Sequence, residues 1–225
     1  MIFRILKLRI LNPKFNTISF DIFDTLIERK QLSPLDVFIE VGQQILGADQ
    51  ARAFCRERVK AEAKARERLS SRETNIDAIY DCLKTRYGDK CERLMEAEIK
   101  HEIESCQKRE EIFAIYKEAH KRGKRIIIVS DMYLNRKTIE NMLHRCGYEA
   151  YDALYISNEE NASKRTSKLF DVVLTREMLN PCEVVHIGDS LKADFLSAKK
   201  SGISAVLIPR KNGIRRKLYE KSIRG

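Results

Sequence analysis

The sequence predicts an α/β fold with a parallel sheet that is interrupted, after its first strand, by a helical segment. Three observations predict it. Short apolar runs typical of strands alternate with helical patterns from residue 109 onward, and such alternation is typical of parallel sheets. The stretch 31–108 contains helical patterns only. The chain is 43% hydrophobic over 225 residues, which is enough to build a core.

The first part of the chain begins with TISFD (17–21), which reads as a buried strand ending at an acid. Ser33-Pro34 then begins a helix, because serine is a good N-cap and proline suits the first helical position. Glycine after an apolar repeat ends a helix, and strong helix formers fill the region that follows. The helices expected between residues 31 and 108 are 34–46 before Gly47, 49–69, a helix capped by Asn75 that ends near Gly88, and 89–105.

From residue 109 the pattern changes to alternating helices and strands. The expected strands are 125–131, 152–157, 183–189 and 204–208, and the expected helices are 109–122, 137–145, 166–178 and 191–200. Residues 1–11 are expected to add a strand or helix to this core. His186 lies inside a strand and is expected to be a packed core residue. The predicted domains are an α/β core of residues 1–30 and 109–225 and a helical domain of residues 31–108.

The formal net charge of +10 is concentrated at the C-terminus, because residues 199–225 hold nine Lys/Arg against one Asp/Glu. A nucleic-acid reader would carry its basic residues on the folded face. The charge therefore predicts a solvated tail, a linker or a weak contact with an anionic surface, and no specific nucleic-acid binding. Six cysteines without a C-x-x-C pair predict reduced thiols in a cytoplasmic protein. No apolar run has the length of a transmembrane segment.

Polar residues follow the predicted strands, where open parallel sheets bind ligands. Carboxylates hold Mg²⁺, while a lysine and a hydroxyl at a helix N-terminus hold phosphate. A carboxylate facing phosphorus can attack it and form an acyl phosphate. The residues in these positions are Asp21 and Thr25 after the first strand, Ser130-Asp131 after the second, Lys164 after the third, and Asp189 and Asp194 after the fourth.

These segments resemble the four ordered signatures of the haloacid dehalogenase superfamily, most of whose members are phosphohydrolases. The matching strings are SFDIFDTL (19–26), IIIVSD (126–131), KRTSKLF (164–170) and HIGDSLKAD (186–194). The resemblance implies a doubly wound sheet with strand order 3-2-1-4-5, and it makes residues 31–108 a cap that selects substrates. It also implies Mg²⁺ as cofactor.

The resemblance assigns a role to each of these positions. Asp21 becomes the nucleophile, and Asp189 becomes a direct metal ligand supported by Asp194. Ser130 and Lys164 hold the phosphoryl oxygens. Thr25 and Asp131 complete the substrate-binding set.

One position departs from the phosphatase pattern, because Phe23 stands where these enzymes carry an acid–base Asp. The backbone carbonyl of Phe23 can still bind the metal, but the proton chemistry is lost, and such assistance contributes ~10²–10⁴-fold. Asp24, an acid from the cap, or a leaving group of low pKa could compensate. Phe23 also keeps open a dehalogenase, which needs no proton for its leaving halide, and a weakly active or inactive module that binds phosphosugars. The retained Asp189 and Asp194 favour phosphoryl chemistry.

A narrower resemblance concerns the strings FDIFDTL and VSDMYL. They are similar to a bacterial group that stands alone or is fused to glycosyltransferases, often among genes for surface polysaccharides. This implies a sugar or polyol phosphate as substrate, and a glycosyltransferase or another polysaccharide-biosynthesis protein as partner.

Overall fold

The computed structural model describes residues 2–70 and 73–224. Met1, Ser71, Arg72 and Gly225 lie outside the described residues. The chain divides into two compact units. The first comprises Met1–Glu28, Lys108–Met132 and Cys146–Lys211, and the second comprises Arg29–Gln107, Tyr133–Arg145 and Asn212–Gly225.

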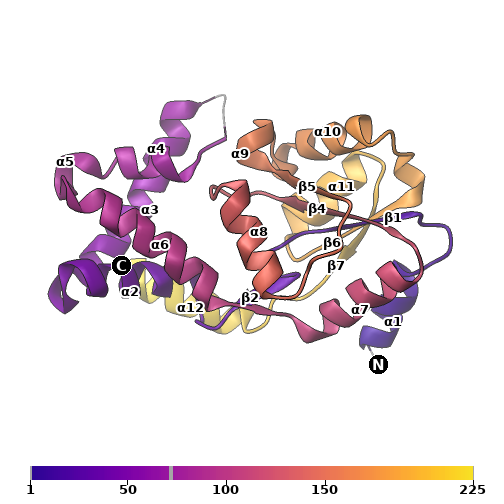
Figure 1. Cartoon of the computed structure of the whole chain (residues 1–225), viewed down its shortest axis with the longest axis horizontal. Helices are drawn as coiled ribbons and strands as arrows, with labels where there is room; N and C mark the ends of the chain where they lie inside the picture. The colour runs from indigo at the N-terminus through magenta and orange to yellow at the C-terminus, as the bar shows by residue number, and fades with distance from the viewer. Residues whose placement is uncertain (1, 71–72, 225) are drawn as a thin grey trace. The chain divides into compact units, whose positions relative to one another are not determined.

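The first unit is built around a five-stranded sheet in the order β5-β4-β1-β6-β7 (Figure 1). The strands are β1 (Thr17–Phe20), β4 (Arg125–Ser130), β5 (Ala153–Ile156), β6 (Val184–Gly188) and β7 (Ser204–Leu207). Every neighbouring pair is parallel. Counting only these strands along the chain, the order is 3-2-1-4-5, so the predicted fold class and strand order are confirmed. The β-branched strand residues are buried, as expected for a sheet covered on both faces.

Helices cover the two faces of this sheet. On one face, Ile127 and Val129 pack with Phe170 and Val173 of α10 and Ala198 of α11. On the other face, Phe20 lies 6.0 Å from Tyr116 of α7, measured between ring centroids. The helices of this unit are α1 (Ile2–Ile10), α7 (Glu110–Lys121), α9 (Ser157–Glu160), α10 (Lys168–Arg176) and α11 (Ser197–Lys200), with 3-10 turns η1 (Lys164–Thr166) and η2 (Pro181–Glu183) and a π-helical turn η3 (Leu191–Leu196).

The second unit is helical. Its helices are α2 (Pro34–Leu46), α3 (Ala48–Leu69), α4 (Ile76–Asp81), α5 (Lys84–Tyr87), α6 (Lys90–Ser105), α8 (Arg136–Arg145) and α12 (Gly213–Arg224). Ser33 caps α2 as expected, because its hydroxyl accepts from the Leu35 amide while Asp36 accepts from the Ser33 amide. The core of this unit holds a buried ion pair in which Arg58 donates to both oxygens of Glu98, each at 2.7 Å.

Three features differ from the sequence predictions. No strand was expected between residues 31 and 108, but β3 (Cys106–Lys108) pairs with the equally unexpected β2 (Ile27–Arg29). Each run has only three residues, which is too short for a periodic signal. The helix expected from Asn75 to Gly88 is divided into α4 and α5 by a turn at Cys82–Leu83. Residues 133–145 and 212–225, which were expected in the core, group with the second unit.

The basic C-terminal segment is not a solvated tail. Residues 204–207 form β7, and α12 packs in the second unit, where the Tyr219 hydroxyl donates to Asp36 and the Ser33 hydroxyl donates to Glu220. The prediction of a solvated tail or linker is therefore wrong. The number of Lys and Arg residues in 199–225 does not indicate whether the other side chains of the segment, such as Tyr219, make contacts with the rest of the chain.

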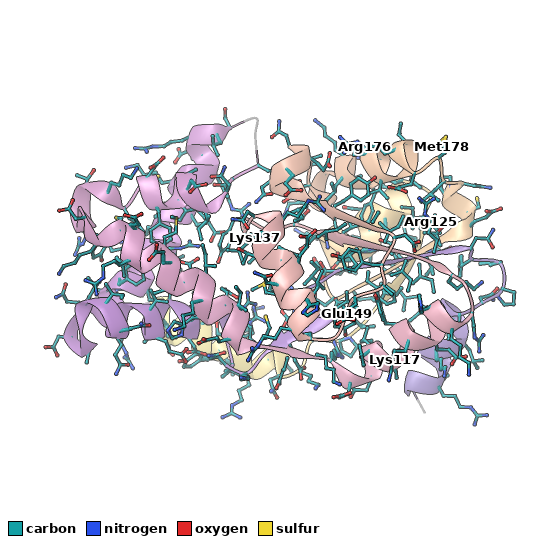
Figure 2. The ribbon with its side chains drawn as sticks, in the orientation of Figure 1. Lys117, Arg125, Lys137, Glu149, Arg176 and Met178 are labelled. Atoms are coloured by element: carbon teal, nitrogen blue, oxygen red, sulfur yellow. The ribbon has the colours of Figure 1, made fainter. Side chains whose placement is uncertain are left out.

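Charged and apolar side chains also project from the surface of the first unit. Figure 2 labels Lys117, Arg176 and Met178 among them, and Met178 is 91% exposed. No helix in the described part of the chain combines the length and apolarity that a membrane span requires.

Candidate active site

The sheet register brings the ends of β1, β4 and β6 together. Phe20 is aligned with Ile128 on one side and with Ile187 on the other. Asp21 directly follows Phe20, and its amide donates to the Ile187 carbonyl at 2.9 Å. Ser130 ends β4 and is buried, and Asp189 directly follows β6. The structure therefore brings Asp21, Ser130 and Asp189 to one edge of the sheet, as the sequence predicts.

Lys164 links this edge to the third predicted motif. It lies in η1, and its buried ammonium donates to Asp21 Oδ1 at 2.5 Å and to Asp194 Oδ1 at 2.6 Å. Asp131 accepts from the Lys164 amide at 2.7 Å and from the Arg165 amide at 3.4 Å. Asp131, predicted to bind substrate, thus uses both oxygens to fix the turn that carries Lys164.

Asp194 lies in the π-helical turn that follows Ser190. The Ser190 carbonyl accepts from the amides of both Asp194 and Phe195, which widens the turn. Asp194 Oδ2 in return accepts from the Ser190 amide at 2.8 Å. Gly188 makes room for this arrangement, because a Cβ there would lie 2.2 Å from Asp194 Cγ. Only glycine therefore lets the Asp194 carboxylate fold back against the end of β6.

Three carboxylates form a potential cation site. Asp21, Asp189 and Asp194 each offer an oxygen, and these atoms lie within 4.8 Å of one another. An all-oxygen donor set suits hard cations such as Mg²⁺. The residues present therefore fit the predicted cofactor. The structure groups all three acids that the sequence nominated as ligands.

Burial and charge set the protonation states at this site. Burial raises the pKa of the Asp21 carboxyl to about 7, against the opposing effect of the Lys164 charge. Burial alone would lower the pKa of Lys164, but the Asp194 and Asp21 carboxylates outweigh it and hold that pKa above its ordinary value. Lys164 is therefore a charged ammonium. A divalent cation beside Asp21 would favour its ionised, nucleophilic form.

Comparison with known proteins places the chain in a family. A family model described as haloacid dehalogenase-like hydrolase matches residues 20–208. The chain belongs to this hydrolase family. A search of the curated proteins found no match. The superfamily assignment made from the four motifs is thus confirmed, whereas the narrower bacterial group is not addressed by these matches.

Solved structures of this hydrolase family share the fold at low sequence identity. L-2-haloacid dehalogenase from Xanthobacter autotrophicus, with chloropropionic acid covalently bound, is 12% identical with a TM-score of 0.63, over 93% of this chain and 84% of that one. YfnB from Bacillus subtilis, a putative HAD-hydrolase bound to magnesium, is 16% identical with a TM-score of 0.60, over 86% of each chain. CbbY from Rhodobacter sphaeroides, in complex with phosphate, is 18% identical with a TM-score of 0.58, over 87% of this chain and 86% of that one.

The loop after Asp21 carries the remaining predicted residues. Thr25 is fully buried, and Phe23 forms an isolated bridge with Ile27. Asp24 adopts a left-handed backbone conformation with a φ of 60°, and its amide donates to the Ile27 carbonyl at 2.7 Å. Asp24 Oδ2 lies 3.7 Å from Arg210 Nε. Because Phe23 replaces the acid–base Asp in this hydrolase, Asp24 is the acid next to that position in the loop. The Arg210 guanidinium lies beside the Asp24 carboxylate.

Two residues at the site were not identified from the sequence. His186 is buried as expected, but its Nε2 lies 3.3 Å from Asp194 Oδ1 and its Nδ1 lies 2.8 Å from the Ser19 hydroxyl. Burial lowers the pKa of His186, so a neutral ring can donate to Asp194 and accept from Ser19. Arg210 donates from Nε to Asp189. The sequence offered one indication for Arg210, because it lies two residues beyond the end of the last predicted strand, where site residues are expected.

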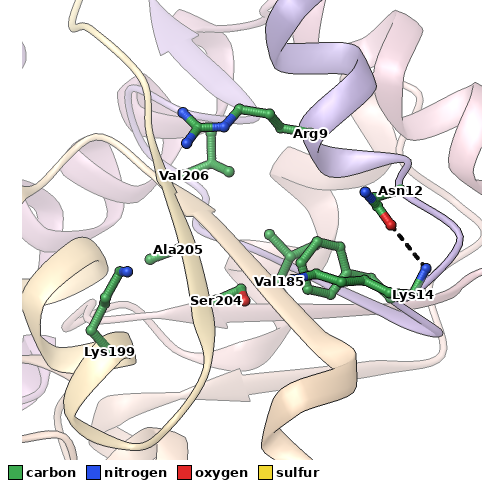
Figure 3. A pocket seen from close by; sticks show the side chains of 9 residues that line it. Arg9, Asn12, Lys14, Val185, Lys199, Ser204, Ala205 and Val206 are labelled. Atoms are coloured by element: carbon green, nitrogen blue, oxygen red, sulfur yellow. Dashed lines mark hydrogen bonds between the residues drawn. The ribbon is translucent and has the colours of Figure 1, made fainter.

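A surface pocket lies elsewhere in the first unit (Figure 3). Arg9, Lys14 and Lys199 contribute to its wall, together with residues near the start of β6 and β7 such as Val185 and Ser204. The candidate site is at the opposite ends of these strands. None of the predicted site residues lines this pocket, so it is not the site that the motifs build.

Proposed function

We propose that this hydrolase is a Mg²⁺-dependent phosphomonoesterase that works through an aspartyl-phosphate intermediate. One observation carries the proposal: Asp21, Asp189 and Asp194 place oxygens within 4.8 Å of one another. Three carboxylate oxygens this close together form the all-oxygen donor set that Mg²⁺ prefers, whereas a metal-independent reaction has no need of such a set. The magnesium named with YfnB and the phosphate named with CbbY agree with this chemistry for proteins of the same fold.

The proposed reaction begins with Asp21. One of its carboxylate oxygens attacks phosphorus, the phosphorus–oxygen ester bond breaks, and the alcohol leaves as an alkoxide that takes up a proton from water. Lys164 and the Ser130 hydroxyl hold phosphoryl oxygens. Water then attacks the acyl phosphate and releases inorganic phosphate and the Asp21 carboxylate. Asp21, Asp189 and the Phe23 carbonyl, with support from Asp194, would hold Mg²⁺, and the bound cation would supply neutralisation of the negative charge.

The proposal is tested with a generic phosphoester such as p-nitrophenyl phosphate. Asp21→Asn and Asp189→Asn are each expected to lower kcat/KM by at least about 10³-fold, on the scale of losing a nucleophile or an essential electrostatic group. A chelator is expected to abolish turnover, and added Mg²⁺ to restore it. Asp171→Asn, which changes an exposed acid of α10, is the matched control and keeps full activity. Full activity in the Asp21→Asn protein would refute the mechanism.

Dehalogenation is the second candidate, and Phe23 is the observation that favours it, because a halide leaves without a proton. In that reaction Asp21 attacks carbon and the carbon–halogen bond breaks. A 2-haloacid assay with and without chelator separates the two candidates. Chelator-resistant halide release, without phosphoester turnover, would replace the phosphatase proposal.

Phe23→Asp tests whether the natural enzyme lacks its acid–base group. We expect a gain in kcat of about 10-fold or more, because general acid–base assistance is worth ~10²–10⁴-fold when well placed. Phe23→Asn is the control of similar size without an acid. A gain with Asp alone supports a slow or specialised enzyme. No gain, with a fast wild-type protein, would assign the proton to another residue, while no activity in either form would favour a binding module.

We further propose a sugar or polyol phosphate as the substrate class, and a glycosyltransferase or another polysaccharide-biosynthesis protein as partner. The strings FDIFDTL and VSDMYL support both ideas. A screen of phosphorylated sugars and polyols, run with and without Mg²⁺, tests the substrate class. Exclusive turnover of other phosphoesters would reject it.

A further inference from the structure

The segment that follows β7 is fastened to the loop that follows β1. Arg109, which is buried, donates from Nη1 to the Asp24 carbonyl at 2.8 Å and from Nη2 to the Pro209 carbonyl at 3.0 Å. Lys211 donates to Glu28 at 2.8 Å. Contacts on both sides of Arg210 thus hold the backbone of this segment in place, and the Arg210 side chain is not needed for that purpose.

Arg210 instead directs its side chain to the carboxylates of the candidate site. Its Nε donates to Asp189 Oδ2 and lies 3.7 Å from Asp24 Oδ2. The Asp189 side chain is only 4% exposed, whereas that of Arg210 is 44% exposed. A guanidinium has five N–H donors, and the contact with Asp189 uses only the one on Nε. The Nη donors therefore make no hydrogen bond to any described residue.

The negative charge of the candidate site explains why a second positively charged side chain, Arg210, is present beside Lys164. Five acids, Asp21, Asp24, Asp131, Asp189 and Asp194, surround the site. Lys164 pairs with Asp21 and Asp194, and Arg210 with Asp189. A divalent cation that used Asp189 would therefore meet a carboxylate that already has a positive partner.

We propose that Arg210 and the divalent cation compete for Asp189, and that the guanidinium released from Asp189 binds an anionic oxygen of the phosphorylated substrate. This inference rests on the proposed function. It makes Arg210 a further substrate-binding residue and predicts that cation and phosphate bind cooperatively. Asp24 Oδ2, which lies 3.7 Å from Arg210 Nε while Arg210 is paired with Asp189, would attract the displaced guanidinium and keep it near the site.

Isothermal titration of the protein of residues 1–225 tests the proposal, with Mg²⁺ alone and with Mg²⁺ in saturating inorganic phosphate. In the wild-type protein, phosphate is expected to tighten Mg²⁺ binding. Arg210→Ala is expected to bind Mg²⁺ alone about tenfold more tightly, a change of about 1.4 kcal/mol, and to show a smaller effect of phosphate than the wild-type protein. Arg210→Lys keeps the charge without the planar donors and is expected to lie between the two proteins.

Lys200→Ala is the matched control, because it removes the same charge from an exposed position of α11 that takes no part in holding the Arg210 segment. It should bind Mg²⁺ like the wild-type protein. An Arg210→Ala protein with unchanged or weaker binding of Mg²⁺ alone, or one in which phosphate tightens Mg²⁺ binding as much as in the wild-type protein, would overturn the proposal. Unchanged Mg²⁺ binding in an Asp189→Asn protein would instead contradict the metal site of the proposed function. The failure of this proposal and the failure of the proposed function are therefore distinguishable.

Discussion

The Asp194 carboxylate shows how tightly single residues are fitted at the candidate site. Lys164, His186 and the Ser190 amide all contact it. Gly188 packs directly against the carboxylate, since a Cβ at position 188 would lie 2.2 Å from Asp194 Cγ and 2.5 Å from Asp194 Oδ2. Because real Cβ atoms do not approach this closely, any side chain at position 188 must displace the carboxylate.

We therefore predict that Gly188→Ala weakens Mg²⁺ binding by about 10- to 100-fold, the range seen when groups that orient metal ligands are lost. Overpacking is also expected to destabilise the protein by about 1–3 kcal/mol. Calorimetric Mg²⁺ titration and denaturant unfolding measure the two effects. Gly123→Ala is the control for Mg²⁺ affinity only, because its added methyl group has nothing within 4 Å, whereas its φ of 63° makes alanine strained and lowers stability by itself. Equal Mg²⁺ affinity in both variants would contradict the steric argument.

The site residues that directly follow strands or lie in a known motif could be predicted from the sequence. Asp21, Ser130 and Asp189 were accessible because parallel strands end at one edge. Arg210 was not, because it lies in a segment whose charge pattern predicted solvent, and its contact with Asp189 spans 21 residues of the chain. His186 was placed correctly in the core, but its contact with Asp194 depends on the π-helical turn.

At the scale of elements, helices with strong caps were predictable and short strands were not. Ser33 and Asn75 begin helices as expected, since their side chains accept from backbone amides one turn on. The range 191–200 was expected as one helix, but its first six residues form a π-helical turn around Asp194. The side-chain contacts of Asp194 favour the wider turn, and no local propensity encodes them.

The pairing of α3 with α6 gives a prediction for the helical unit. Arg58 of α3 is fully buried, and its guanidinium lies 4.6 Å from the centroid of the Phe38 ring as well as against Glu98 of α6. Glu98→Gln keeps the shape but removes the fully buried carboxylate partner of Arg58, and it leaves only the partly exposed Glu62 carboxylate, 3.2 Å away, to compensate the charge. We expect a loss of about 3–5 kcal/mol in the free energy of unfolding, measured by denaturant unfolding followed by circular dichroism.

Glu57→Gln is the matched control for that experiment. It removes a carboxylate of α3 whose partner, Arg86, is 60% exposed, so that the expected loss is below about 1 kcal/mol. Similar losses in the two variants would mean that burial does not govern the strength of these ion pairs.

At the scale of the whole molecule, discontinuous segments build each unit. The second unit combines Arg29–Gln107 with Tyr133–Arg145 and Asn212–Gly225. From the sequence, a helical domain of residues 31–108 was predicted, and residues 133–145 and 212–225 were placed in the core because they follow it in chain order. Contacts such as that between the Tyr219 hydroxyl and Asp36 join residues far apart in sequence, and no local pattern predicts them.

The role of the basic C-terminal segment gives the last prediction. A chain ending at Lys211 loses α12, whose Tyr219 and Glu220 contact Asp36 and Ser33, the two capping residues of α2. It also loses the buried Ile223. Two hydrogen bonds at about 1 kcal/mol each and one apolar side chain at about 1.5–3 kcal/mol suggest a loss of about 3–5 kcal/mol.

Hydrogen exchange locates this loss, because the amides of α2 and α3 should lose protection while those of β1, β4 and β6 keep theirs. A Lys217→Ala, Lys221→Ala double variant is the control, since it removes charge from exposed positions of α12 and keeps Tyr219, Glu220 and Ile223. A charge effect would appear in both proteins, whereas a packing effect appears only in the truncated one. Unchanged protection after truncation would return this segment to the solvated tail that its charge pattern predicts.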